Sequence, residues 1–137
     1  KISNKKHLKR IQLADLFLDT FPYNAHTTAL DALWSGLPLL TCTGKTFTSR
    51  VAASLLKAIN MPELITHFSK DFESKAIEIA SCPIKFEEIK NKLINNKYKE
   101  PLFNGDIFKD NFEAALKKMY LNYKLGLKPK SFEIQNK

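Results

Sequence analysis

Hydrophobic residues in the first half of the chain form short continuous runs that alternate with runs at helical spacing. Residues 16–20 and 38–42 are apolar almost throughout and precede proline, asparagine or glycine, which is typical of strands buried on both faces of a parallel sheet. Residues 27–35 and 49–59 place apolar side chains three and four positions apart, and Gly36 is expected to end the first of these helices. This order of strand, helix, strand and helix predicts an α/β fold, a Rossmann-like parallel sheet with right-handed connections and flanking helices.

The remaining apolar positions predict further helices and one short strand. The expected helices cover residues 4–14, 70–80, 86–96 and 106–125, and the short strand covers residues 63–66. Pro83 is expected to break the chain between two of these helices, and Gly126 to end the last one. We therefore expect one domain over residues 1–125, ending in a helix, and a polar tail over residues 126–137.

The last predicted helix carries an apolar stripe that is broader than a domain of this size needs. The stripe consists of Phe108, Phe112, Leu116, Met119 and Tyr123. Packing against a larger body is the favoured interpretation of these residues, ahead of a platform on which nucleic-acid bases stack.

The composition places the chain among globular proteins of one domain. It has 137 residues, of which 44% are hydrophobic and 26% charged, and no apolar run approaches the about 18 residues that span a bilayer. The first ten residues lack the apolar core of a secretory signal. We expect a cytoplasmic protein without a membrane partner.

The net charge of +8 raises the possibility of a basic module that binds nucleic acid or an anionic surface. Five of the cations lie within residues 1–10, where there is no acid, but 20 of the 22 cations are lysines rather than arginines. Arginine is the usual residue for forked recognition of phosphates and bases. The charge therefore favours a solvated lysine-rich surface, and a nucleic-acid partner is not expected.

The two cysteines give no sign of a disulfide framework or a zinc site. Cys42 and Cys82 stand 40 positions apart, and neither belongs to a C-x-x-C pair or has a histidine at metal-ligand spacing. We expect both to be buried thiols.

The most informative polar segment follows the first predicted strand. In parallel α/β sheets ligands bind at the carboxyl ends of the strands, where the next helix presents unpaired amides to anions. Thr27 and Thr28 are placed to offer amides and hydroxyls to a phosphate, and Asp31 to accept from a ribose hydroxyl. Alternatively, Thr28 and Asp31 form a capping box that needs no ligand. His26 allows a similar choice between a helix cap and a functional role, and His7 one between plain surface and function.

The second junction between strand and helix imitates a phosphate-binding P-loop. Gly44, Lys45 and Thr46 match the end of that motif, but Leu39 stands where its first glycine is required. A P-loop nucleotidase is therefore not expected. The sequence also shows no pair of carboxylates and no Ser-His-Asp arrangement at a catalytic spacing.

Several segments are informative when they are read in order: His7-Leu8-Lys9-Arg10, Gln12 to Thr20, Pro22 to Thr28, Asp31 to Trp34, Gly36-Leu37-Pro38, Ser49 to Leu56 and Pro62 to Ile65. Together they resemble the O-linked N-acetylglucosamine transferases, especially the bacterial forms with tetratricopeptide repeats. The resemblance is strongest over residues 7–65 and extends to the segment Pro101-Leu102-Phe103.

The resemblance implies the UDP-sugar-binding C-terminal domain of a GT-B glycosyltransferase. Carried over to matching positions, His7 would stack on the uracil, Asp31 would hold the ribose, and His26, Thr27 and Thr28 would receive the diphosphate. No metal or other cofactor is implied, because helix amides can stabilise the leaving UDP. The sequence departs from the family at Asn4, where many members have a nucleotide-binding lysine, and at Leu30 and Lys45.

The resemblance also implies that the parent protein is larger. The first strands of this domain, the N-terminal catalytic domain, the catalytic base and the tetratricopeptide repeats that recruit acceptors would all lie outside these residues. The expected partners are then a UDP-sugar, an acceptor protein and those missing parts, and the chain alone is expected to be inactive. Two alternatives stay open, namely the basic binding module and a GT-B domain that uses another nucleotide-sugar.

Overall fold

The computed structural model describes residues 2–134 and has a parallel three-stranded sheet at its centre. The strand order is β1 (Phe17–Leu18), β2 (Leu39–Cys42) and β3 (Ile65–Thr66), with Phe17 opposite Leu39 and Thr41 opposite Ile65. All four residues of β2 are buried, as expected for the central strand of a parallel sheet. The predicted α/β fold is confirmed.

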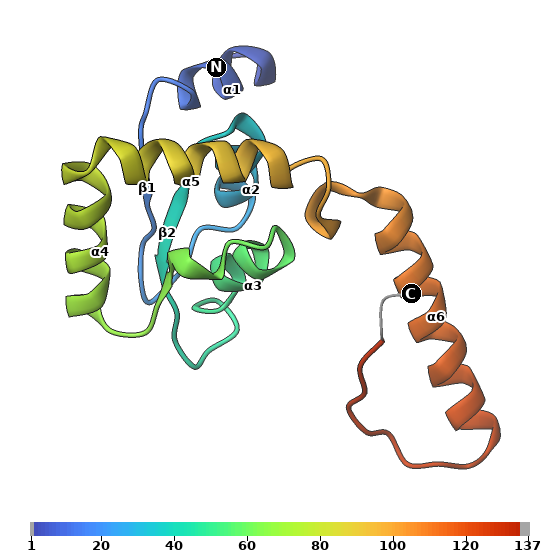
Figure 1. Cartoon of the computed structure of the whole chain (residues 1–137). Coiled ribbons are helices and arrows are strands. Elements are labelled where there is room, and N and C mark those ends of the chain that lie inside the picture. Colours follow the sequence, from blue (N-terminus) through green and yellow to red (C-terminus); the bar gives the residue numbers. More distant parts are fainter. Residues whose placement is uncertain (1, 135–137) are drawn as a thin grey trace. The chain divides into compact units, whose positions relative to one another are not determined.

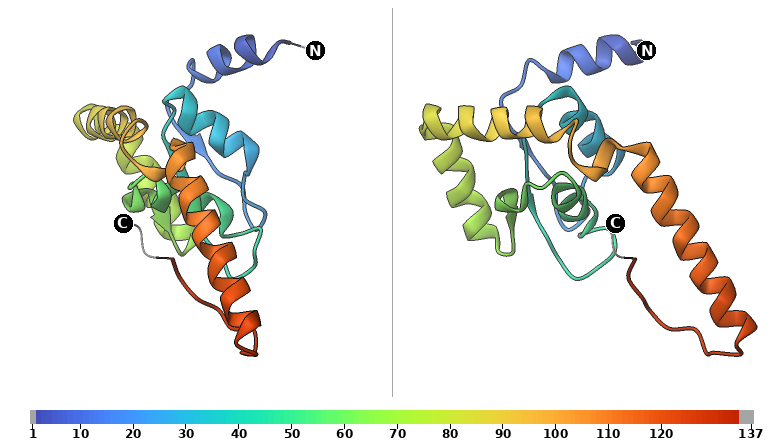
Figure 2. Two further views of the ribbon diagram at one scale, coloured as in Figure 1. Left: turned by 90° about the vertical axis from the view of Figure 1, so that its right-hand side faces the viewer. Right: turned by 45° about the vertical axis from the view of Figure 1, so that its right-hand side comes forward.

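Helices cover the sheet and supply most of the apolar core. α2 (Thr27–Ser35) and α3 (Val51–Ala58) contact β2 and each other, whereas α4 (Ser69–Ser81) contacts β2 and β3. Figures 1 and 2 show the sheet between α4 on one side and α2 and α3 on the other. The fully buried apolar side chains include Leu33, Leu39, Leu40, Leu56, Ile59, Met61, Leu64 and Leu93.

The first helix lies on α2 rather than on the sheet. α1 (Asn4–Ile11) begins after Ser3, whose hydroxyl accepts a hydrogen bond from the Lys6 amide, and it has no buried residue. Its contacts are with α2. A helix with so little apolar contact is held mainly by this one neighbour.

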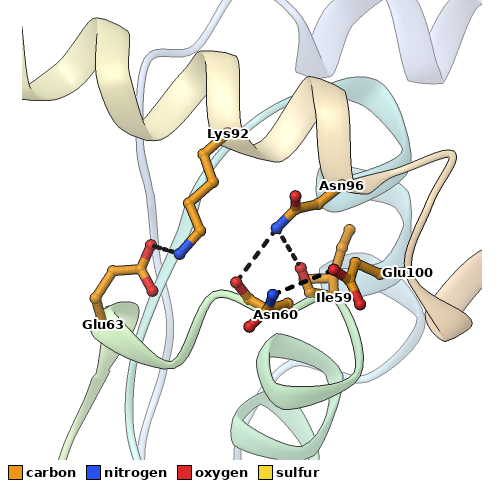
Figure 3. A network of polar contacts seen from close by, with 6 residues as sticks. All are labelled: Ile59, Asn60, Glu63, Lys92, Asn96 and Glu100. Atoms are coloured by element: carbon orange, nitrogen blue, oxygen red, sulfur yellow. Dashed lines mark hydrogen bonds and ion pairs between the residues drawn. The ribbon is translucent and has the colours of Figure 1, made fainter.

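Polar contacts connect α5 (Pro83–Asn96) to the end of α3 and to the short 3-10 helix η1 (Pro62–Leu64) (Figure 3). The Asn96 side-chain amide donates to the carbonyls of Ile59 and Asn60, at 2.9 and 3.2 Å. Lys92 pairs with Glu63 at 2.7 Å, and the Asn60 side chain donates to Glu100 at 3.1 Å. We call the side chains of this group the α5 clamp: Asn60, Glu63, Lys92, Asn96 and Glu100. They lie at the surface or are half-buried.

Several boundaries differ from the sequence prediction. Only residues 17–18 of the run at 16–20 pair as a strand, and the first helix ends at Ile11 rather than at residue 14. The break predicted at Pro83 is confirmed, because α4 ends at Ser81, but the next helix begins at Pro83 itself rather than at residue 86, since a missing amide costs nothing at the first helical position. Cys82, expected to be buried, is half-buried because it lies at the junction of α4 and α5, whereas Cys42 is buried as expected.

The chain divides into two compact units, Lys1–Leu102 and Phe103–Lys137. The short 3-10 helix η2 (Pro101–Phe103) spans the boundary, and the second unit contains α6 (Gly105–Lys124). α6 begins with the Asn104 side chain accepting from two amides and ends before Gly126, whose φ of 64° confirms the predicted stop. The assignment of residues 1–125 to one UDP-sugar-binding domain stays a prediction.

The predicted apolar stripe of α6 is present, and no residue of this helix is buried. The rings of Phe108 and Phe112 stack on each other with centroids 5.9 Å apart. Among the described residues no helix is both long and apolar enough to cross a membrane.

Candidate functional site

The start of α2 presents backbone amides that the helix itself does not use. The first amide bonded within the helix is that of Leu30, which donates to the His26 carbonyl at 3.1 Å. His26 stands at the N-cap position but makes no side-chain cap, so the amides of the first turn face outward. Thr28 is the second helical residue rather than the cap. The capping box considered for Thr28 and Asp31 is therefore not formed.

The structure brings His7 and Asp31 together from two helices. The His7 Nε2 atom lies 3.5 Å from the Asp31 Oδ2 atom, and the two side chains are 29% and 30% exposed. The Arg10 guanidinium lies 3.2 Å from the other ring nitrogen, Nδ1. Since a guanidinium can only donate, Nδ1 is the acceptor and the proton of the neutral ring resides on Nε2, facing Asp31. Both residues were candidates from the sequence, but their contact was not predicted.

His26 is fixed between two aromatic rings beside the helix start. Its ring stacks on Tyr23, with centroids 5.1 Å apart, and meets the edge-on ring of Phe47 at 6.2 Å. Its Nε2 atom is buried and has no hydrogen-bond partner within residues 2–134. A buried ring nitrogen without a partner is costly unless a ligand or water completes it.

The buried polar side chains of the described structure all lie close to the same edge of the sheet. We call them the edge network: Asp19, Asn24, Thr41, Ser49 and Thr66. Each belongs to the carboxyl end of a strand or to a loop that follows one. Buried polar groups need partners in fixed positions, so this edge of the sheet is the part of the core with the most constrained geometry.

Asp19 occupies the centre of the edge network and is 4% exposed. Its Oδ1 atom accepts from the amides of Thr20 and Ala25, at 2.8 and 2.7 Å. Its Oδ2 atom accepts from the Thr41 hydroxyl at 2.6 Å. The carboxylate therefore holds both ends of the segment between β1 and His26. Sequence reasoning placed Asp19 at the junction without assigning it a role, although a carboxylate that directly follows an apolar strand is a usable signal.

Asn24 adds a second tether to the same loop. Its side-chain amide donates to the carbonyls of Thr20 and Cys42, at 2.9 and 3.4 Å, and its backbone amide donates to the Thr48 carbonyl at 3.0 Å. The loop before α2 is thus attached to both β2 and the loop that follows it. No pattern in the sequence singled out Asn24 beyond its role as a strand breaker.

The loop between β2 and α3, which forms the second junction, is held by hydrogen bonds among its own residues. The Ser49 hydroxyl accepts from the Thr46 amide at 3.0 Å, and the Gly44 amide donates to the Ser49 carbonyl at 2.9 Å. A Cβ atom at Gly44 would lie 2.6 Å from the Ser49 Oγ atom. Because the Gly44 and Thr46 amides are used inside the loop, they are not available to cradle a phosphate.

A hollow of about 520 Å³ lies beside the site along α3. Phe47, which meets His26 edge-on, forms part of its wall. The other residues that line it include Thr43, Arg50, Val51, Ser54 and Lys57. Among residues 2–134 there is no group of three or more histidine, cysteine, aspartate or glutamate side chains that could hold a metal ion.

Comparison with known proteins identifies the family. The model of glycosyl transferase family 41 matches residues 2–112. The chain belongs to this family. A probable UDP-N-acetylglucosamine--peptide N-acetylglucosaminyltransferase SPINDLY of Hordeum vulgare is 31% identical over 126 residues, which are 92% of this chain and 13% of that protein. The UDP-N-acetylglucosamine--peptide N-acetylglucosaminyltransferase of Caenorhabditis elegans is 31% identical over 125 residues, 91% of this chain and 11% of its own length.

A solved structure shows the same fold. A mutant of the O-GlcNAc transferase of Thermobaculum terrenum superimposes with a TM-score of 0.74 at 25% sequence identity, covering 87% of this chain and 22% of that one. The fold expected from the resemblance, part of a GT-B transferase domain with a helical end, is confirmed. The chain spans only 13% and 11% of the two curated relatives, so it corresponds to a small part of each.

Proposed function

We propose that this chain forms the donor-binding part of a larger enzyme that transfers N-acetylglucosamine from UDP-N-acetylglucosamine to serine or threonine hydroxyls of proteins. Membership of family 41 and the activity for which the relatives are named support the reaction. The single observation that carries the site is the pairing of His7 with Asp31 at 3.5 Å, next to the open amides at the start of α2.

The pair formed by His7 and Asp31 is suited to binding a uridine. The contact between His7 and Asp31 lies at the edge of the imidazole, so the face of the ring stays available for stacking on uracil. After that contact the Asp31 carboxylate still has free lone pairs, which can accept a hydrogen bond from a ribose hydroxyl. In this proposal His7 reads the base and Asp31 holds the sugar next to it.

The start of α2 suits a diphosphate. Its amides and the positive end of the helix dipole stabilise negative charge, and His26 stands at the N-cap position directly before them. Thr27 and Thr28 are exposed and add hydroxyl donors. In the transfer, the bond between the anomeric carbon and the diphosphate breaks, a bond to the acceptor oxygen forms, and the acceptor proton passes to a base. These donors would stabilise the charge that develops on UDP without a metal, and the base is expected outside this chain.

Thermal unfolding with different nucleotides tests the proposal. A ligand that binds only the folded chain raises stability by about 2.7 kcal/mol at one hundred times its dissociation constant. We expect UDP to raise the melting temperature more than ADP or GDP does, and His7→Ala to remove most of that preference. Lys92→Ala, at a surface ion pair of the α5 clamp, is the control and should leave it unchanged. Equal shifts with all three nucleotides would contradict uracil recognition.

A basic binding module is the second candidate, because α1 carries Lys5, Lys6, Lys9 and Arg10. Binding to nucleic acid through such charges releases counterions, so the affinity would fall steeply with salt concentration. Binding of UDP through stacking and a helix start would change much less. A salt titration of both ligands therefore decides between the two functions.

A further inference from the structure

We infer that Asp19 is a positioning residue that sets the diphosphate end of the donor site without touching the donor. This inference rests on the proposed function, because it concerns how the start of α2 is held for a phosphate. It uses contacts in the edge network that neither the predicted site nor the family resemblance assigned to any role.

The Asp19 carboxylate is hydrogen-bonded to both ends of the loop that precedes α2. One oxygen accepts from the amides of Thr20 and Ala25, so it holds the first residue of the loop and the residue directly before His26. The other oxygen is fixed by the Thr41 hydroxyl on β2. The Asp19 carboxylate therefore connects the residue before His26 to the central strand of the sheet, beside the second tether at Asn24.

The same bonds determine which amides remain for a ligand. The amides of Asn24 and Ala25 are taken by the Thr48 carbonyl and by Asp19. The helix begins immediately afterwards, and its first internal bond is that of Leu30. The amides of Asn24 and Ala25 are thus already used, whereas those of Thr27 and Thr28 in the first turn of α2 have no acceptor within the helix and remain for a ligand.

Thr66 provides a matched comparison inside the edge network. Its buried hydroxyl donates to the Thr41 carbonyl at 3.0 Å, between β2 and β3. Like the Thr41 hydroxyl it is a buried donor with one partner, but it does not contact the loop before α2. Substitution of Thr66 should therefore cost stability without moving the site.

The test compares the affinities of UDP and uridine for four variants of the chain. Asp19→Ala leaves two amides and one hydroxyl without an acceptor, so we expect the dissociation constant of UDP to rise by about tenfold or more and that of uridine by less than about threefold. Asp19→Asn keeps an oxygen for both amides and should rescue UDP binding to within about threefold of the unsubstituted chain. Thr66→Val should leave both affinities unchanged.

Thr41→Val is the fourth variant and covers the case in which Asp19→Ala does not fold. It removes only one bond to the carboxylate and should weaken UDP binding by about threefold with uridine unaffected. A purely structural role would lower both affinities together or neither. Either result, in Asp19→Ala or, failing that, in Thr41→Val, overturns the inference.

Amide hydrogen exchange separates this inference from the proposed function. Asp19→Ala should accelerate exchange at Thr20 and Ala25 but not at Ser54, whose amide donates to Arg50 within the α3 region. If the unsubstituted chain does not bind UDP, the proposed function fails, and exchange alone then decides whether Asp19 holds the loop. Unchanged exchange at Ala25 would overturn the inference whether or not UDP binds.

Discussion

The edge network and the α5 clamp contain similar polar side chains in opposite surroundings. The edge network is buried at the carboxyl end of the sheet, whereas the α5 clamp lies at or near the surface between α5 and the end of α3. A buried donor or acceptor that loses its partner pays the full cost of desolvation, whereas an exposed one exchanges its partner for water. The comparison therefore teaches that hydrogen bonds of similar length fix geometry only where water cannot replace them.

The largest effect is expected from Asn24→Ala. Asn24 is 1% exposed, and its substitution leaves the carbonyls of Thr20 and Cys42 without their side-chain donor. We expect the free energy of unfolding to fall by about 3 kcal/mol. Urea unfolding followed by circular dichroism measures this change. Asn95→Ala, an exposed asparagine on α5, is the control and should change stability by less than about 0.5 kcal/mol. Equal losses in the two variants would contradict the distinction between buried and exposed hydrogen bonds.

The second largest loss of unfolding free energy is expected from Thr41→Val. The substitution keeps the volume of a fully buried side chain but removes the 2.6 Å hydrogen bond to the Asp19 carboxylate. We expect a loss of about 2 kcal/mol in unfolding free energy, because bonds to charged groups contribute more than neutral ones. Thr66→Val, which removes a bond to a neutral carbonyl, should cost about 1 kcal/mol. A larger loss at Thr66 than at Thr41 would contradict the central place given to Asp19.

The α5 clamp should respond more weakly to comparable changes. Asn96→Ala removes a part-buried bond to the Ile59 carbonyl and an exposed bond to the Asn60 carbonyl and should cost about 1 kcal/mol, and Lys92→Ala should cost about 0.5 kcal/mol or less. Raising the salt concentration should reduce the second effect but not the first, because only the second involves an ion pair. The same urea titrations at low and high salt provide the measurement.

The smallest effect concerns an exposed ion-pair group next to the clamp. Hydrogen bonds from Lys85 and Lys75 lower the pKa of Glu78 from its ordinary value of 4.5. A lowered pKa means that this stabilisation is fully present above pH 4.5 and is lost as the pH falls through the folded-state pKa. Lys85→Met should move the pKa of Glu78 back toward 4.5, as followed by NMR titration of its carboxyl carbon. An unchanged titration would show that the pair does not form in solution.

The sequence predicted the elements of this fold better than the contacts between them. The continuous apolar run of β2 and the helical spacing of α2 follow from local pattern, and both appear where expected. The two-residue length of β1 does not follow, because pairing depends on how far its neighbour extends. The break at Pro83 was predicted correctly, but the start of the next helix was placed three residues too late, because proline is compatible with the first turn of a helix.

The candidate site shows the same limit. His7, His26, Thr27, Thr28 and Asp31 were all named from the sequence, four of them from one short segment. The contact of His7 with Asp31 joins residues on different helices and depends on how α1 packs on α2. The role of Asp19 depends on Thr41, 22 residues further along the chain. Partners brought together by the sheet cannot be read from spacing alone, and the assignment of all five residues to UDP stays a prediction.

The different burial of the two cysteines allows local opening of the sheet to be followed by thiol modification. Cys82 is half-buried at the corner between α4 and α5, whereas Cys42 is buried at the end of β2, where its carbonyl accepts from Asn24. A maleimide added to the native protein should therefore modify Cys82 first and reach Cys42 only when the end of β2 separates from its neighbours. The rate of the second modification counts the openings of the sheet edge directly beneath the candidate site, without any engineered label.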